Sequence, residues 1–171
     1  MKRFLLPAAV VALLYVFLRP IGSIPIAGYV RGISGDLSIT TMLLLASSAV
    51  RFAGGPKLHD RRELQTLAAL VLAGAAFLYP MALGLTSFDP YALGYPHRMR
   101  GLLLGLATVA LVAWFRGRLL LPLAIVLALA AFRFELLEST NLWDYLLDPW
   151  LAVGMLCWAG FTIFARSSKS R

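Results

Sequence analysis

The stretch LQTLAALVLAGAAFLYPMALGL, residues 64–85, contains no charged side chain. A helix of this length rises about 1.5 Å per residue and is therefore longer than the roughly 30 Å hydrocarbon core of a bilayer. Pro80 lies near one end of the stretch and predicts a kink there. The sequence therefore predicts a helix that crosses a membrane.

Further apolar runs on both sides of this stretch predict additional crossings. They occupy residues 4–18, 37–52, 101–115, 119–134 and 150–165. We therefore expect an all-α polytopic transmembrane helical bundle with about six membrane-spanning helices, folded as a single integral-membrane domain over residues 1–171. The alternative is a bundle with five or fewer full crossings, in which the first or second run lies partly in the interface.

The charges between these runs sort by sign when the gaps are assigned alternately to the two sides of the membrane. Inside are Lys2, Arg3, Arg51, Lys57, Arg61, Arg62, Arg116, Arg118, Arg166, Lys169 and Arg171, with the acids Asp60 and Glu63. Outside are Arg19, Arg31, Arg98, Arg100 and Arg133, with the acids Asp36, Asp89, Glu135, Glu138, Asp144 and Asp148. Because basic loops stay cytoplasmic during insertion, this partition predicts that both termini are cytoplasmic.

The overall composition agrees with a membrane protein. The 171 residues are 60% hydrophobic and 14% charged, whereas soluble domains are about half apolar and a quarter charged. The net charge of +8 is placed in short loops, where it sets topology and meets anionic headgroups, so nucleic acid is not an expected partner. The single cysteine, Cys157, excludes an internal disulfide and a cysteine-based metal site.

The N-terminal run resembles a secretory signal, because Lys2 and Arg3 precede an apolar segment. No small-x-small cleavage site follows it, so we expect an uncleaved first crossing. Residues 21–30 are broken by glycine and proline, and we expect a non-helical segment there.

Short polar signals predict where several helices begin, end or pack. Asp36 or Ser38 is the expected N-cap of the second run. Gly101 and Gly105 form a GxxxG pair that favours close packing against another helix.

The residues that follow the fifth run predict more helical structure at the outer end. Its helical pattern continues through residues 133–138, which would place Glu135 and Glu138 on one face. Residues 141–148 predict a short outer interfacial helix, with Trp143 and Tyr145 at the headgroup level.

Two outer segments hold the candidate binding residues. In the first, four carboxylates and one arginine at the membrane rim suit a cation, a proton relay or a cationic headgroup, or simply help to fix orientation. In the second, a histidine and two arginines beside tyrosines suit a phosphate group at the outer leaflet, unless neighbouring acids merely compensate the arginines. With the two acids that lie nearest in the outer layer, the candidate set is Asp36, Asp89, His97, Arg98, Arg100, Arg133, Glu135, Glu138, Asp144 and Asp148.

Several classes of protein are disfavoured. The only histidines, His59 and His97, are assigned to opposite faces, which argues against a bis-histidine haem site. No HExxH, GxSxG or phosphate-loop motif is present. We therefore expect no cofactor and no metal, and the catalytic residues, if there are any, are not identified by a motif.

These observations favour a non-enzymatic accessory or assembly component of a bacterial inner membrane. Membrane lipids and other inner-membrane proteins are its expected partners. Two alternatives remain open. One is a transporter or binder of a lipid or anionic headgroup at the outer leaflet, and the other is an intramembrane enzyme that uses outer carboxylates and His97.

Overall fold

The computed structural model describes residues 15, 19–21, 24–25, 28–29, 31–32, 35–85 and 87–167 of the chain. The chain divides into two units, Met1–Asp36 and Leu37–Arg171, and each is described by itself.

The first unit contains one small pair of strands. β1 (Pro20–Ile21) and β2 (Ile24–Pro25) are antiparallel, with Ile21 opposite Ile24. The predicted crossing at residues 4–18 lies outside the described residues, apart from Tyr15.

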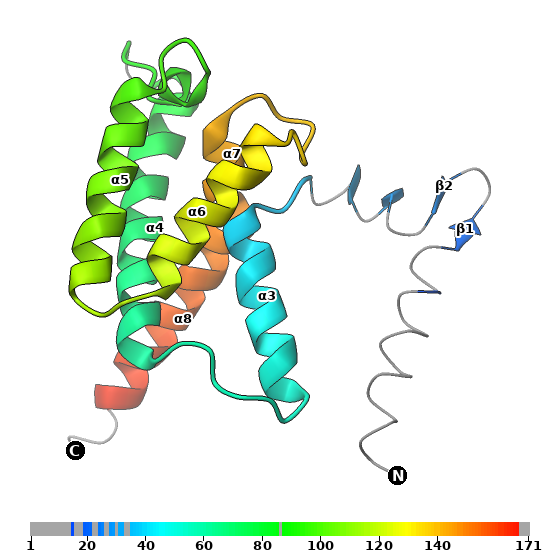
Figure 1. Cartoon of the computed structure of the whole chain (residues 1–171), viewed down its shortest axis with the longest axis vertical. Coiled ribbons are helices and arrows are strands. Elements are labelled where there is room, and N and C mark those ends of the chain that lie inside the picture. Colours follow the sequence, from blue (N-terminus) through cyan, green and yellow to red (C-terminus); the bar gives the residue numbers. More distant parts are fainter. Residues whose placement is uncertain are drawn as a thin grey trace. The chain divides into compact units, whose positions relative to one another are not determined.

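Every regular element described in the second unit is helical. The elements are α3 (Ile39–Phe52), α4 (Arg61–Ala82), the 3-10 helix η1 (Tyr91–Gly94), α5 (Arg100–Phe115), α6 (Leu120–Arg133), α7 (Leu142–Leu146) and α8 (Pro149–Ser167) (Figure 1). The all-α prediction is confirmed for this unit. The short helix expected near residues 141–148 is also present, as α7.

Helix length does not support six crossings. Among the described residues, one helix is long and apolar enough to cross a membrane, at Arg61–Met81 within α4. The other apolar helices are shorter, and α3 and α6 have 14 residues each. Fourteen residues of helix rise roughly 21 Å, which is less than the 30 Å or so of a bilayer core. The predicted stretch 64–85 therefore overlaps the one candidate span among the described helices, Arg61–Met81.

Polar side chains fix where two of these helices begin. Ser38 is the N-cap of α3, as predicted, and its Oγ accepts a hydrogen bond from the backbone N–H of Thr41 at 3.2 Å. Asp60 and Glu63 form a capping box at the start of α4. The other oxygen of Glu63, Oε1, also accepts from the N–H groups of Leu119 and Leu120, at 2.6 and 3.1 Å. One carboxylate therefore caps α4 and α6 and holds their ends together.

The predicted continuation of the fifth helix through residues 133–138 is wrong. α6 ends at Arg133, and Glu135 has a φ of 53°, a left-handed conformation that a helix does not contain. The backbone N–H of Leu137 donates to the hydroxyl of Tyr145 rather than to a carbonyl one turn earlier. This tertiary contact draws the chain out of the helix, so Glu135 and Glu138 do not share a helical face.

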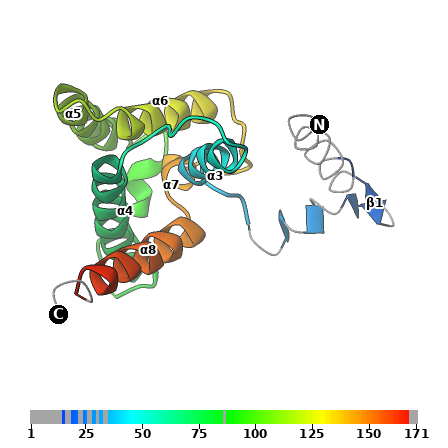
Figure 2. The ribbon, with the colours of Figure 1, turned by 90° about the horizontal axis from the view of Figure 1, so that it is seen from below.

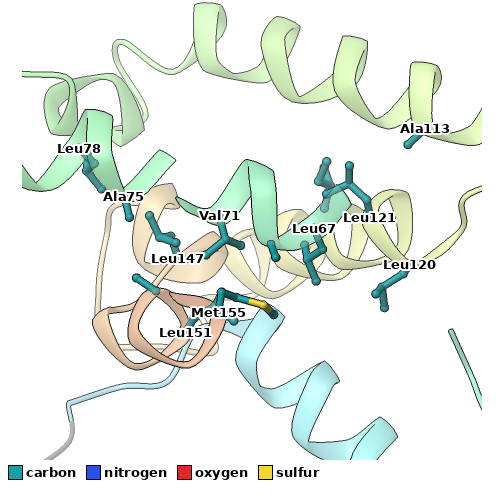
Figure 3. Packing of buried hydrophobic residues seen from close by; sticks show 13 residues of the cluster. Leu67, Val71, Ala75, Leu78, Ala113, Leu120, Leu121, Leu147, Leu151 and Met155 are labelled. Carbon is teal, nitrogen blue, oxygen red and sulfur yellow. The ribbon is translucent and has the colours of Figure 1, made fainter. Parts of the chain in front are cut away.

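The core lies where α4 faces α8 and α6. Leu67, Val71 and Ala75 recur every four residues along α4, and they meet Leu151 and Met155 of α8 (Figure 3). The repeat places one apolar stripe of α4 against its neighbours.

The GxxxG pair makes no close helix contact within the described part of the chain. A Cβ atom built on Gly101 or Gly105 would meet no atom within 4 Å, and both residues are exposed. The close helix contact that this pair allows is therefore not made within the second unit.

The helix ends alternate between the two ends of the second unit. The connections that follow α3 and α5 lie at the same end as the last turn of α8, whereas η1 and α7 lie at the opposite end (Figure 1). In the view from below, α7 lies in the middle, and four helices surround it: α4, α8, α3 and α6 (Figure 2). The basic loops assigned inside by sequence therefore fall at one end, and the acidic segments that belong to this unit fall at the other.

Candidate functional site

The carboxylate of Asp148 is the most heavily hydrogen-bonded acid of the second unit. Asp148 is only 4% exposed. Its Oδ2 accepts from the N–H and the hydroxyl of Ser38, at 2.9 and 2.7 Å, and from the hydroxyl of Thr41. Its Oδ1 accepts from the N–H of Leu151 at 2.8 Å. Asp148 therefore satisfies donors at the first turns of both α3 and α8.

Local sequence explains the position of this carboxylate. Pro149 is the first residue of α8, where proline loses no helical hydrogen bond and where its fixed φ suits the helix. The residue before it adopts an N-cap conformation readily, and an aspartate there also interacts favourably with the helix dipole. The segment Asp148-Pro149 is thus a strong helix start. Oδ1 of Asp148 caps α8, and its other oxygen, Oδ2, accepts hydrogen bonds from the first turn of α3.

The hydrogen bonds control the pKa of Asp148. Burial alone raises the pKa of the carboxyl, but the hydrogen bonds from Ser38, Thr41 and Leu151 outweigh burial and hold the pKa below its usual value of 3.8. A folded pKa below the unfolded one stabilises the protein above the unfolded pKa, and this contribution is lost as pH falls through the folded pKa.

This shift predicts an acid-sensitive fold. We expect the melting temperature of the wild type to fall as pH drops below about 4, with a steeper slope than in Asp148→Asn, which has no carboxyl to titrate there. Thermal unfolding followed by tryptophan fluorescence from about pH 7 to pH 3 measures both slopes. Equal slopes in the two proteins would contradict the assignment of acid sensitivity to Asp148.

The second acid of this region, Asp144, is also held by the chain itself. Its Oδ2 accepts from the hydroxyl of Tyr91 at 2.7 Å and from the hydroxyl of Ser139. Burial, followed by the hydrogen bond to Asp144, raises the pKa of Tyr91 well above its usual range, so this phenol remains a donor at neutral pH. Asp144 therefore joins α7 to η1.

Asn141 completes the link between α7 and η1. It is 1% exposed, and its Oδ1 accepts from the N–H of Trp143 at 3.0 Å as the N-cap of α7. Its Nδ2 donates to the carbonyl of Tyr91 at 2.9 Å, while the indole N–H of Trp143 donates to the carbonyl of Pro90 at 3.0 Å. Gly94 packs directly against this amide.

Tyr145 lies at the centre of the α7 region and is fully buried. Its hydroxyl accepts from the N–H of Leu137 at 3.2 Å and is 3.0 Å from the carbonyl of Leu137, to which it can donate. Its ring meets Phe132 edge-on at 5.2 Å. Tyr145, which was predicted at the headgroup level, turns its side chain toward the interior of the bundle.

Removing the buried hydroxyl of Tyr145 should destabilise the fold. We expect Tyr145→Phe to lower the free energy of unfolding by about 1–2 kcal/mol, because the N–H of Leu137 would be left buried without an acceptor. Chemical unfolding of the purified protein measures the loss. The matched variant Tyr95→Phe removes the hydroxyl of a half-buried tyrosine and should stay within about 0.5 kcal/mol of the wild type. Equal losses in the two variants would contradict the role given to Tyr145.

The remaining candidate residues of this unit lie at the surface. Asp89 caps the η1 turn, with its Oδ1 accepting from the N–H of Tyr91 at 3.0 Å. His97 stacks on Tyr95 at a ring distance of 6.1 Å, and Tyr95 in turn meets Tyr91 edge-on at 5.8 Å. The exposed members of the set are Asp89, His97, Arg98, Arg100, Arg133, Glu135 and Glu138.

Asp36 belongs to the first unit. Its Oδ2 accepts from Nη2 of Arg31 at 2.9 Å, in an ion pair five residues apart. The structure thus brings Asp144 and Asp148 into the α7 region by buried contacts, and it leaves the arginines and glutamates of the candidate set at the surface.

The partners of the buried Asp148 and the half-buried Asp144 are not indicated by the sequence. Ser38 is predicted as an N-cap, but nothing in the sequence indicates that Ser38 and Thr41 donate to an aspartate 110 and 107 positions away. Comparison of the chain with protein-family models, with curated proteins and with solved structures finds no match in any of the three.

Proposed function

We propose that the chain is a small multi-pass protein of a bacterial inner membrane with a non-enzymatic accessory or assembly role. The single observation that carries the proposal is the apolar outer surface of the helices in the second unit. Large apolar side chains cover the outward faces of the helices, and the buried carboxylate of Asp148 is held by the chain's own donors. A bilayer is the solvent that makes such a surface favourable.

The exposed apolar side chains lie on the helices that were predicted to cross the membrane. Leu104 of α5 is 71% exposed, and Phe161 and Ile163 of α8 are 76% and 67% exposed. In water, exposed apolar area of this extent marks an interface or an aggregation risk. The distribution supports crossings by α3, α5, α6 and α8 beside α4, with local thinning of the bilayer or flanking residues making up for their shortness.

The polar network supports an accessory role over a catalytic one. A catalytic carboxylate needs a free oxygen within reach of a substrate. Both oxygens of the buried Asp148 are occupied by backbone or hydroxyl donors. We infer that Asp148 stabilises the fold of the outer end, and that the chain acts through the contacts that its apolar faces make.

Co-purification from native membranes tests the accessory role. The tagged chain is extracted with a mild detergent or a membrane-solubilising polymer, and its native mass is measured. The proposal predicts a stoichiometric complex that survives in His97→Ala, Glu135→Gln and Glu138→Gln, because these exposed residues support no chemistry. A protein that is solitary in every mild extraction would contradict the proposal. An intact complex whose cellular function is lost in one of these variants would favour the enzyme instead.

A further inference from the structure

A cavity opens at the basic end of the second unit, between α4, α5 and the turn that joins α5 to α6. Its volume is about 750 Å³, which falls within the range of small-molecule sites. Its polar lining consists of Arg62, Gln65, Thr66, Thr108, Arg116 and Arg118, and the rest of the lining is apolar. None of the lining residues is acidic.

The arginines at this cavity have unused donor capacity. Arg118 donates one hydrogen bond, to the hydroxyl of Thr66. Within residues 35–85 and 87–167, Arg62 and Arg116 have neither a side-chain hydrogen bond nor an ion pair. An arginine fork is suited to two oxygens of a phosphate group. Three such groups around one cavity therefore favour an anion with phosphate-like geometry.

The nearest acid does not cancel this charge. Glu63 adjoins Arg62 in sequence, but both of its oxygens accept from backbone N–H groups, those of Asp60 on one side and of Leu119 and Leu120 on the other. Its carboxylate is thus committed to capping two helices and does not line the cavity. The arginines remain uncompensated within the lining.

An apolar groove continues from the basic end. A second cavity of about 340 Å³ shares Leu70, Val109 and Leu121 with the first. It extends between α4 and α5 as far as Phe77 and Trp143. α5 packs mainly on α6 rather than on α4. A single groove therefore changes along its length from cationic to apolar.

The groove is long enough to hold one lipid chain together with its headgroup. From Arg62 to Phe77 the α4 wall rises roughly 22 Å at 1.5 Å per residue, whereas one leaflet of hydrocarbon is about 15 Å thick. A headgroup beside the arginines and an acyl chain along Leu70 and Val109 would both fit within that length.

We propose that this groove binds one anionic phospholipid from the leaflet on the basic side of the membrane. The phosphate contacts Arg62, Arg116 and Arg118, and one acyl chain lies between α4 and α5. The inference rests on the proposed membrane location. It differs from the outer-leaflet binder considered from sequence, because basic pockets between helices at the cytoplasmic side are where anionic headgroups are held.

Native mass spectrometry of the full chain tests the inference. The protein is reconstituted in nanodiscs of phosphatidylcholine with a minor fraction of phosphatidylglycerol, and the lipid that remains bound on release is identified. We expect one retained phosphatidylglycerol in the wild type and a roughly tenfold to hundredfold lower retention in Arg62→Gln/Arg116→Gln, which removes two phosphate contacts. The control Arg51→Gln/Arg61→Gln removes two charges at the same end outside the groove and should change retention less than about threefold.

A second variant separates a groove from a charged surface. Leu70→Trp fills the apolar part without altering charge, so retention should fall although all arginines remain. Equal losses in the two arginine pairs, unchanged retention in Leu70→Trp, or full displacement of the lipid by millimolar inorganic phosphate would each overturn the proposal. Membrane location is tested separately by an alkaline carbonate wash. A chain that stays in the membrane pellet but retains no anionic lipid overturns this inference alone.

Discussion

Replacing Asp148 by alanine is expected to lower the free energy of unfolding by about 3–5 kcal/mol, the largest effect of any single substitution considered for this chain. The carboxylate accepts hydrogen bonds from the backbone of Ser38 and Leu151 and from the hydroxyls of Ser38 and Thr41. Alanine leaves the N–H groups of Ser38 and Leu151 without this acceptor, and the hydroxyls of Ser38 and Thr41 can then bond only to each other, at 3.1 Å. It also disconnects the start of α3 from the start of α8.

Thermal unfolding of the purified protein measures this loss, which corresponds to a melting temperature roughly 10 °C lower in a domain of this size. Asp89→Ala is the matched control. It removes an exposed aspartate that accepts one hydrogen bond, from the N–H of Tyr91, and should cost about 1 kcal/mol or less. A loss in Asp148→Ala no larger than in Asp89→Ala would show that the buried carboxylate does not hold the two helices.

Gly94→Ala should be the second most damaging change. A Cβ at this position would lie 1.8 Å from Oδ1 of Asn141 and 2.7 Å from Cδ1 of Trp143. The amide of Asn141 is buried and donates to the carbonyl of Tyr91, so it cannot move without losing that bond. We expect a loss of about 3 kcal/mol, from overpacking together with a broken buried hydrogen bond.

Gly105→Ala is the matched control for this substitution. A Cβ on Gly105 meets no atom within 4 Å, and the residue lies inside α5, so alanine should be neutral or stabilise the helix by up to about 1 kcal/mol. Chemical unfolding of both variants provides the comparison. A Gly94→Ala protein as stable as Gly105→Ala would contradict the packing of η1 against α7.

Local patterns in the sequence were sufficient to place the helices. The apolar runs match α3, α4, α5, α6 and α8 closely, because runs of this kind are bounded by caps and turn residues that act within a few positions. Ser38 illustrates this, since the predicted N-cap hydrogen bond spans three residues. Asn141 at the start of α7 is a second example.

Long-range contacts were beyond such patterns. Nothing near Asp148 in the sequence indicates that its oxygen binds Ser38, 110 positions away, and nothing near Glu63 indicates that it caps α6. The end of α6 failed for the same reason, because Tyr145 diverts the N–H of Leu137 from the helix. The glycine pair of α5 shows the converse, since a pattern that permits close packing does not supply a partner.

For the candidate site, the sequence predicted which end of the bundle holds the charged residues, but not which of these residues contact one another. The sequence places at the outer end charged residues that are not needed to set topology. Of these, Asp144 lies in α7 and Asp148 follows it, and both are held by hydrogen bonds. The arginines at the outer end carry no comparable set of buried contacts. The groove lined by Arg62, Arg116 and Arg118 could not be predicted, because a basic loop that sets topology does not indicate which other loops share a cavity with it.

Cysteine accessibility in intact cells tests the central claim, that the chain crosses a membrane with its α7 end outside and its basic end inside. Cys157 is the only cysteine, so Cys157→Ala gives a silent background. Single cysteines are then placed at Ser87 and Thr140 for the outer end and at Lys57 for the inner end, all of which are exposed. A membrane-impermeant maleimide should label the first two in intact cells and Lys57→Cys only after permeabilisation. Labelling of all three in intact cells, or of none until permeabilisation, would contradict the account.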